Sequence, residues 1–231
     1  MKRIISKLRY ILMGLLPSSV VLMLHNITDT PTLGKKITLS EEKFYLLADS
    51  FKSWISIKDV LSPRSKKGIV MTFDDGYDDI YTVASPYLTQ KKIPFTIFVT
   101  PDKLNQVGYL TTEQLKEISC NELCTVGGHC YHHQPLAKLS REEQEFELLK
   151  SKEEIEKIIG KPVEYMAYPY GQHNQDTDEI LMTTDAYKAA FTTVFGFENF
   201  VNRKKRFQQP RVGVDNSVFD KRLAFLKKRY K

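Results

Sequence analysis

The stretch Gly68-Ile-Val-Met-Thr-Phe-Asp-Asp-Gly-Tyr77 places two acidic side chains directly after a run of mostly apolar residues. Residues 68–73 include β-branched side chains and predict a buried strand. Asp74 and Asp75 stand at its end, where Gly76 permits a sharp turn. Two neighbouring buried carboxylates are costly unless positive charge compensates them, and a divalent cation can supply it. Because neighbouring side chains of an extended segment point in different directions, one carboxylate can bind a metal while the other acts as a base.

A second segment carries further metal ligands. Val126-Gly-Gly-His-Cys-Tyr-His-His-Gln-Pro135 contains three of the five histidines in the chain. His129 and His133 are four residues apart, and one turn of helix or a tight loop brings such a pair to one cation. Two histidines and one carboxylate bind one face of a metal and leave the other open to water and substrate. Such a histidine pair is a weak signal alone, and the Asp-Asp-Gly sequence strengthens it. We expect His132 to support this site or lie on the surface.

Short apolar runs alternate with helical patterns along the whole chain. The predicted strands are residues 19–25, 68–74, 94–99, 124–128, 164–168, 189–194 and 210–214. Helix starts are predicted at Ser40, which two glutamates follow, and at the capping boxes Thr111-x-x-Gln114 and Ser140-x-x-Glu143. The helix after Ser140 is expected to stop at Gly160. This alternation of strands and helices predicts a parallel sheet.

Polar residues follow several of these strands at the carboxyl end. They are His25, Asp74, Asp75, His129 and Tyr170. In a closed βα barrel these strand ends share one mouth, where catalytic groups collect. An open doubly wound sheet is the alternative, but the sequence shows neither a switch point nor a phosphate-binding loop. The pattern therefore favours a barrel.

Composition indicates one large domain. A chain of 231 residues with 42% hydrophobic content can bury a full core, and no linker or repeat divides it. We expect a domain over residues 18–231, preceded by an amphipathic basic helix over residues 1–17. That helix is too short to span a bilayer, so we expect it to lie on a membrane surface or cover one end of the fold. A signal anchor is the alternative, which would place the domain outside the membrane.

Positive charge is concentrated at the two ends of the chain, in residues 1–16 and 203–231. We expect the first of these and the C-terminal tail to contact anionic lipid headgroups, with solvated surface charge as the alternative. No nucleic-acid partner is expected, because no aromatic residues interleave with a basic patch. The odd set Cys120, Cys124 and Cys130 predicts buried free thiols in a reducing compartment, and hence a cytoplasmic location.

Three segments carry a resemblance to a known family. Residues 72–77 (TFDDGY), 127–136 (GGHCYHHQPL) and 167–171 (AYPYG) resemble, in order and spacing, the successive motifs of polysaccharide deacetylases. This family is also called the NodB-homology domain, or carbohydrate esterase family four, and the resemblance covers residues 19–215. It implies an α/β fold, an incomplete, TIM-like (β/α)7 barrel. It also implies a metal-dependent hydrolase that removes N-acetyl groups from amino sugars of a glycan or its lipid-linked precursor.

The resemblance also implies roles for single residues. Asp75, His129 and His133 would hold a divalent cation, expected to be zinc, and Asp74 would be the general base. The backbone N–H of Tyr170 would help to stabilise the oxyanion.

The chain departs from the family pattern in two places. The family's usual general acid is a histidine near the C-terminus, but no histidine follows His173. Some members are circularly permuted, and this chain resembles them, so His25 becomes the expected general acid. A core or loop role for His25 is the alternative. Many members also carry an arginine at the position of Ala167, and Arg211 is the expected replacement that pairs with the base.

Other functions fit the same residues. An O-acetyl ester or a small cyclic amide would use the same metal site, and the loops around it show no recognisable sugar-binding pattern. A catalytically silent protein that binds a glycan is a third interpretation. Catalytically silent proteins usually lack the base or one of the metal ligands. The residues expected in these roles, Asp74, Asp75, His129 and His133, are all present in this chain.

Overall fold

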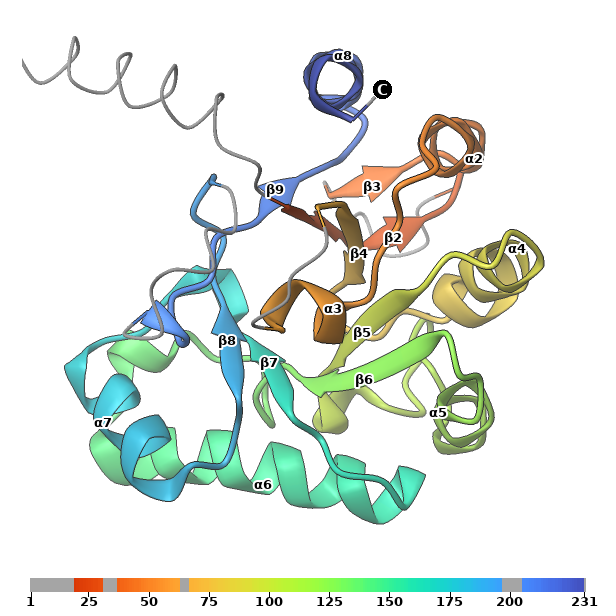
Figure 1. Ribbon diagram of the computed structural model, residues 1–231. Coiled ribbons are helices and arrows are strands. Elements are labelled where there is room, and N and C mark those ends of the chain that lie inside the picture. Colours follow the sequence, from red (N-terminus) through yellow and green to blue (C-terminus); the bar gives the residue numbers. More distant parts are fainter. Residues whose placement is uncertain (1–18, 31–36, 63–66, 197–204, 231) are drawn as a thin grey trace, which may run out of the picture.

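All seven predicted strands are present, and they lie parallel in one curled sheet (Figure 1). The computed structural model describes residues 19–30, 37–62, 67–196 and 205–230. The order across the sheet is β8-β7-β6-β5-β4-β1-β9. The strands are β1 (Val20–Leu24), β4 (Ile69–Phe73), β5 (Phe95–Val99), β6 (Cys124–Gly128), β7 (Tyr165–Ala167), β8 (Ala189–Phe191) and β9 (Val212–Gly213). The sheet forms the incomplete (β/α)7 barrel that the sequence predicted.

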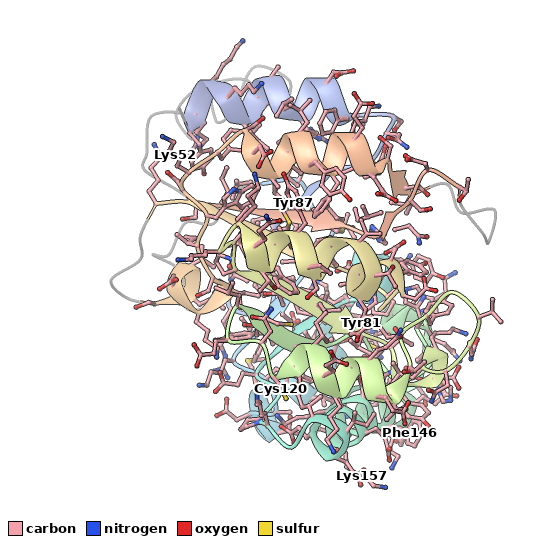
Figure 2. The ribbon with its side chains drawn as sticks, turned by 90° about the vertical axis from the view of Figure 1, so that its right-hand side faces the viewer. Lys52, Tyr81, Tyr87, Cys120, Phe146 and Lys157 are labelled. Carbon is pink, nitrogen blue, oxygen red and sulfur yellow. The ribbon has the colours of Figure 1, made fainter. Side chains whose placement is uncertain are left out.

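Helices cover the outside of this barrel (Figure 1). They are α2 (Glu41–Asp49), α4 (Ser85–Gln90), α5 (Thr112–Ser119), α6 (Arg141–Ile159), α7 (Gln175–Thr184) and α8 (Phe219–Arg229). Figure 2 shows α8, α2, α4 and α5 stacked one above the other on one side. The predicted caps are confirmed: the side chains of Ser40, Thr111 and Ser140 each accept a hydrogen bond from the backbone three residues later. Gly160 ends α6 in the left-handed conformation.

The strands bury both of their faces. One set of alternating residues packs under the helices, and the other set fills the barrel. The interior set includes Val21, Val70, Phe98, Ala167 and Phe191. The short helix α3 (Ile57–Leu61) contributes Ile57 and Val60 to the same cluster, so it closes the amino-terminal end of the barrel. The interior is therefore apolar at that end, and the polar residues lie at the opposite end.

The chain between residues 206 and 211 fills the seam between the two edge strands. The Ala190 N–H donates to the Arg206 carbonyl (3.0 Å), and the Thr192 N–H donates to the Gln209 carbonyl (2.8 Å). The segment therefore runs along β8 before it enters β9, which pairs with β1 at the other edge of the sheet. Arg211 is the last residue before β9. Its side chain consequently enters the barrel at the seam.

A small second sheet follows the first strand. It consists of β2 (Asn26–Ile27) and β3 (Thr38–Leu39), which pair in parallel. Strands of two residues are too short for a periodic pattern, and the sequence did not predict them. The predicted helix at residues 1–17 lies outside the described residues. Within the described ranges, no helix is both long and apolar enough to cross a membrane.

Close packing around Gly127 in the barrel predicts that a larger side chain there lowers stability. A β-carbon there would lie 2.6 Å from the Phe98 ring and 2.7 Å from the Tyr165 carbonyl oxygen. Gly127→Ala should therefore lower the free energy of unfolding by about 1–3 kcal/mol through overpacking. Urea unfolding measures this cost. In the double variant Gly127→Ala/Phe98→Leu, the smaller leucine side chain should relieve part of this loss of stability. If the two single effects simply add, the clash of the added β-carbon with the Phe98 ring is not the cause.

Candidate active site

The register of two central strands brings the first polar residues together at the mouth of the barrel. On β4, Thr72 and Asp74 follow Val70 at alternate positions and so face the interior. On β1, Met23 pairs with Thr72, and the Asp74 N–H donates to the Leu24 carbonyl (2.9 Å). This register, continued by one residue, places His25 beside Asp74. Two residues separated by 49 positions thus become neighbours through one pair of strands.

A buried ion pair joins Asp74 to Arg211. The guanidinium donates from Nη1 to Oδ1 and from Nη2 to Oδ2, both at 2.6 Å. Its Nε donates to the Thr192 carbonyl (3.0 Å), and Nη1 also reaches the Thr72 hydroxyl (3.2 Å). Arg211 is fully buried and Asp74 is 2% exposed. The pairing expected from the sequence is therefore present.

The Asp74 carboxyl is held in its charged form. Burial raises its pKa, but the Arg211 guanidinium and the nearby His129 and His25 lower it by more. The resulting pKa lies below that of an ordinary aspartate, so the carboxylate is ionised at neutral pH. Below Arg211 lies the Phe98 ring, 5.5 Å from the guanidinium carbon. The ion pair thus separates the apolar interior of the barrel from the pocket at its mouth.

Three potential metal ligands converge beside this pair. Asp75 Oδ1 lies 3.3 Å from His129 Nε2 and 3.0 Å from His133 Nε2. In a tetrahedral zinc site with ligands about 2.0–2.1 Å from the metal, neighbouring ligand atoms lie roughly 3.3 Å apart. Asp75 Oδ1 is also buried without a well-formed hydrogen bond. The spacing, the donor types and this buried oxygen fit a divalent cation held by Asp75, His129 and His133.

The other ring nitrogen of His129 orients the imidazole. Nδ1 lies 2.7 Å from the Ala167 carbonyl oxygen, a contact that requires the proton on Nδ1. The neutral ring therefore presents the lone pair of Nε2 towards Asp75. Burial lowers the pKa of His129, but Asp75 and Asp74 raise it by more. The two carboxylates thus favour positive charge at this position, as a cation site requires.

The backbone around these residues is unusual. Seven non-glycine residues of the described part have positive φ, and four of them belong to this region. They are Asp75 (74°), Cys130 (58°), His133 (62°) and Tyr170 (58°). The histidine pair therefore lies in a tight loop, which was one of the two geometries that its spacing allowed. Strained conformations of this kind persist only where surrounding contacts hold them, and they cluster at functional sites.

His132 lies on the other side of this loop. Its Nδ1 is 2.6 Å from Glu147 Oε1, and its backbone N–H donates to Glu147 Oε2 (2.9 Å). Glu147 is 3% exposed on α6, whereas the His132 side chain is 40% exposed. Glu147 thereby anchors the segment that carries both histidine ligands. His132 supports the loop from the surface, as expected, and sequence reasoning gave no sign of Glu147.

A pocket of about 390 Å³ opens at the barrel mouth. Its walls include Asp75, His133, His25, Tyr170, Tyr77, Tyr109, Thr100, Lys103 and Ile37. Tyr170 is 60% exposed and lies at the rim, where its ring meets that of His133 at 4.9 Å. His25 Nδ1 is buried and has no hydrogen-bond partner among the described residues. Burial lowers the pKa of this imidazole, although Asp74 and Asp75 raise it in part.

The segment after His25 is tied to the strand-end motif. Asp79 Oδ2 accepts hydrogen bonds from Asn26 Nδ2 (2.5 Å) and from the Ile27 backbone N–H (3.0 Å). This contact holds β2 against the short helix Ile80–Ala84, so His25 is fixed on both sides. Asp79 was not predicted from the sequence, although it stands only four residues after Asp75. Its position within the acidic run Asp-Asp-Gly-Tyr-Asp-Asp was the available signal.

One expectation about the cysteines was wrong. Cys130 is buried and Cys124 is partly buried, but Cys120 is exposed. All three are free thiols, as expected. Cys120 is the residue that follows the last residue of α5, and its side chain is exposed to solvent there. Burial raises the pKa of Cys124 to about 12, so this thiol is unreactive at neutral pH.

Comparison with known proteins identifies the chain's relatives. The family model described as polysaccharide deacetylase matches residues 62–188, which include Asp74, Asp75 and both histidine ligands but neither His25 nor Arg211. The protein YxkH of Bacillus subtilis is 30% identical over 129 residues, or 56% of this chain and 46% of that protein. The peptidoglycan-N-acetylmuramic acid deacetylase PdaA of Bacillus subtilis is 27% identical over 75% of this chain and 59% of its own. The chain thus spans about half the length of these relatives.

A solved structure has the same fold over nearly its whole length. The Streptococcus pyogenes deacetylase PplD, determined in complex with acetate, superimposes with a TM-score of 0.78. The alignment covers 93% of this chain and 98% of that one, at 23% identity. The shared fold extends beyond the segment that the family model matches, to both edges of the sheet.

The buried ion pair predicts a stability effect. Arg211→Met would leave Asp74 buried without its partner, and loss of one member of such a pair costs about 3–5 kcal/mol of unfolding free energy. The double variant Asp74→Asn/Arg211→Met removes the uncompensated charge and should recover most of this loss. Chemical unfolding of these two variants and of the single variant Asp74→Asn measures the coupling. A double variant as unstable as Arg211→Met would show that the charge of Asp74 is not the cause.

Proposed function

Because the chain belongs to the polysaccharide deacetylase family, we propose that it hydrolyses N-acetyl groups on amino sugars of a polysaccharide or its lipid-linked precursor. The observation that carries this proposal is the convergence of Asp75, His129 and His133 next to an aspartate held by Arg211. PdaA, whose name specifies a peptidoglycan amino sugar, supports the substrate class. The pocket of about 390 Å³ has room for one sugar ring with its acetamido group.

The proposed reaction is the hydrolysis of the amide bond of an N-acetyl group. Water adds to the acetyl carbon, the C–N bond breaks, and the products are acetate and the free amine. Asp75, His129 and His133 would hold the metal, for which zinc is our proposal. When bound, a divalent cation supplies Lewis acidity to the acetyl oxygen and lowers the pKa of the attacking water, which a base as weak as Asp74 requires.

Two side chains would carry out the proton transfers, Asp74 as acceptor and His25 as donor. A carboxylate oxygen of Asp74 accepts the proton of the water, while Arg211 keeps that carboxylate ionised and fixed in the barrel. His25 donates a proton to the departing nitrogen. Burial lowers the pKa of His25, which makes its protonated form a stronger acid but leaves a smaller fraction of the protein protonated there at neutral pH. Tyr170, whose backbone bends sharply at the rim, would direct its N–H to the developing oxyanion.

The placement of His25 favours an amide over an ester as substrate. An amine is a poor leaving group unless it is protonated, whereas the alkoxide of an activated ester departs more readily. His25 is partly buried, its Nδ1 has no partner within the described part of the chain, and it lies on the wall of the same pocket as Asp75, so it can protonate the leaving amine. O-acetyl esters remain the second candidate, since the same base and ligands would attack them.

Metal dependence gives the first test. Acetate release from N-acetylglucosamine oligomers and from N-acetylated peptidoglycan should be abolished by a chelator and restored by added Zn²⁺. A coupled acetate assay measures the release, and elemental analysis of the purified protein measures bound metal. Release that is insensitive to the chelator would overturn the metal mechanism. No release from any acetylated sugar, with metal bound, would favour the glycan-binding alternative.

The role of His25 gives the second test. His25→Ala should lower kcat on N-acetyl substrates by roughly 10²- to 10⁴-fold, the usual contribution of a general acid. Hydrolysis of 4-nitrophenyl acetate should change little, because its leaving group departs without protonation. His173→Ala is the matched control, since that imidazole contacts Asp178 away from the metal ligands. Equal losses on both substrates would show that His25 instead supports the structure of the site.

A further inference from the structure

The second oxygen of Asp75 has a partner of its own. Asp75 Oδ1 faces the two histidines, while Oδ2 accepts a hydrogen bond from the Tyr77 hydroxyl at 2.7 Å. Tyr77 is 5% exposed, so this contact is shielded from bulk water. The two oxygens of one carboxylate are thus assigned to different neighbours. Nothing in the role of Asp75 as a ligand by itself requires this second contact.

Tyr77 is in turn held by Tyr109. Their ring centroids lie 5.0 Å apart with the two planes at 31°, and the two residues form an antiparallel backbone bridge. Tyr109 therefore packs on the ring of Tyr77 and fixes its position. Tyr77 and Tyr109 also line the pocket at the barrel mouth. The ring contact of Tyr109 with Tyr77 and the hydrogen bond of Tyr77 to Asp75 therefore form a relay from the pocket wall to the candidate metal ligand.

The backbone reinforces this arrangement. The Leu110 N–H donates to the Gly76 carbonyl (2.9 Å), and the Asp78 N–H donates to the Gly108 carbonyl (3.3 Å). Residues 108–110 are thus clamped to the turn that contains Tyr77. Asp75 itself has a φ of 74°, a conformation that needs support from its surroundings. The clamp and the phenol together provide it.

On the basis of the proposed metal site, we propose that Tyr77 and Tyr109 are positioning residues that hold Asp75 as a one-oxygen ligand. A free carboxylate can rotate to offer both oxygens to a cation, or turn away from it. A hydrogen bond to Oδ2 removes both options and leaves Oδ1 directed at the site. Since Tyr109 borders the pocket, substrate that contacts it would also act on this ligand. The relay thereby links the pocket wall to the metal site.

Metal affinity is the direct test. Tyr77→Phe removes one hydroxyl and keeps the ring, and loss of such a supporting contact weakens metal binding by roughly 10- to 100-fold. Competition between the apoprotein and a chromogenic chelator for Zn²⁺ measures the dissociation constant without any turnover. In the Co²⁺-substituted protein, a carboxylate free to bind through both oxygens should raise the coordination number and weaken the visible d–d absorption bands.

The ring contact gives a separate prediction for Tyr109. Tyr109→Leu removes the ring that packs on Tyr77, so it should weaken metal binding, but less than Tyr77→Phe does. The double variant should bind metal as Tyr77→Phe does, since the ring of Tyr109 acts only by positioning the Tyr77 hydroxyl. If Tyr77→Phe does not fold, a several-fold weaker affinity in Tyr109→Leu still supports the relay. An unchanged affinity in Tyr109→Leu would overturn it.

Two surface tyrosines provide matched controls. Tyr81 donates to Glu117 (2.7 Å) and Tyr87 donates to Asp49 (2.8 Å), both on the helical side shown in Figure 2. Tyr81→Phe and Tyr87→Phe delete the same hydroxyl–carboxylate contact and should leave the dissociation constant and the Co²⁺ spectrum unchanged. Wild-type values in Tyr77→Phe would overturn the inference while leaving the proposed function intact. Absence of metal binding in the wild-type protein would overturn the proposed function and the relay together.

Discussion

The ion pair between Asp74 and Arg211 is the contact on which the rest of the site depends. It joins a central strand of the barrel to the segment that fills its seam, and both partners are buried. An aspartate in that position would otherwise be protonated or destabilising. The guanidinium keeps it ionised through two short hydrogen bonds and is itself held by the Thr192 carbonyl. The same contact therefore closes the seam of the barrel and keeps the Asp74 carboxylate ionised.

The three candidate metal ligands are held in place by a different kind of contact. Asp75 and His133 have backbone conformations that few residues adopt, and each lies in a segment tied down from outside the site. Glu147 holds the histidine loop from α6, and residues 108–110 hold the turn after Asp75. The strain is tolerated because buried hydrogen bonds on neighbouring elements compensate it. The ligands are thus placed by contacts that a description of the three side chains alone would omit.

The sequence predicted all seven strands of the barrel, since buried parallel strands read as short apolar runs between capped helices. It also predicted that Asp75, His129 and His133 come together at the barrel mouth, because strand ends in a barrel lie on one side, and the structure brings them together. The pairing of Arg211 with Asp74, expected from the family resemblance and the position of Arg211 in its strand, is present as well. It missed the two-residue strands β2 and β3, which have no periodicity, and it placed Cys120 in the interior. The supporting contacts of Tyr77, Asp79 and Glu147 were missed as well. These residues look like surface or turn residues until their partners are known.

By itself, the sequence determined where the strands lie along the chain, the identity of the carboxylate and imidazole groups, and their positions at strand ends. These properties follow from local patterns: apolar runs, capping residues and short spacings along the chain. Only the tertiary structure decided which oxygen of Asp75 faces the histidines, that Arg211 binds both oxygens of Asp74, and that His25 lies beside that aspartate. Such choices depend on strand register and on the seam between β8 and β9, which join residues 137 positions apart. No local pattern encodes a contact of that range, because its geometry exists only once the barrel is closed.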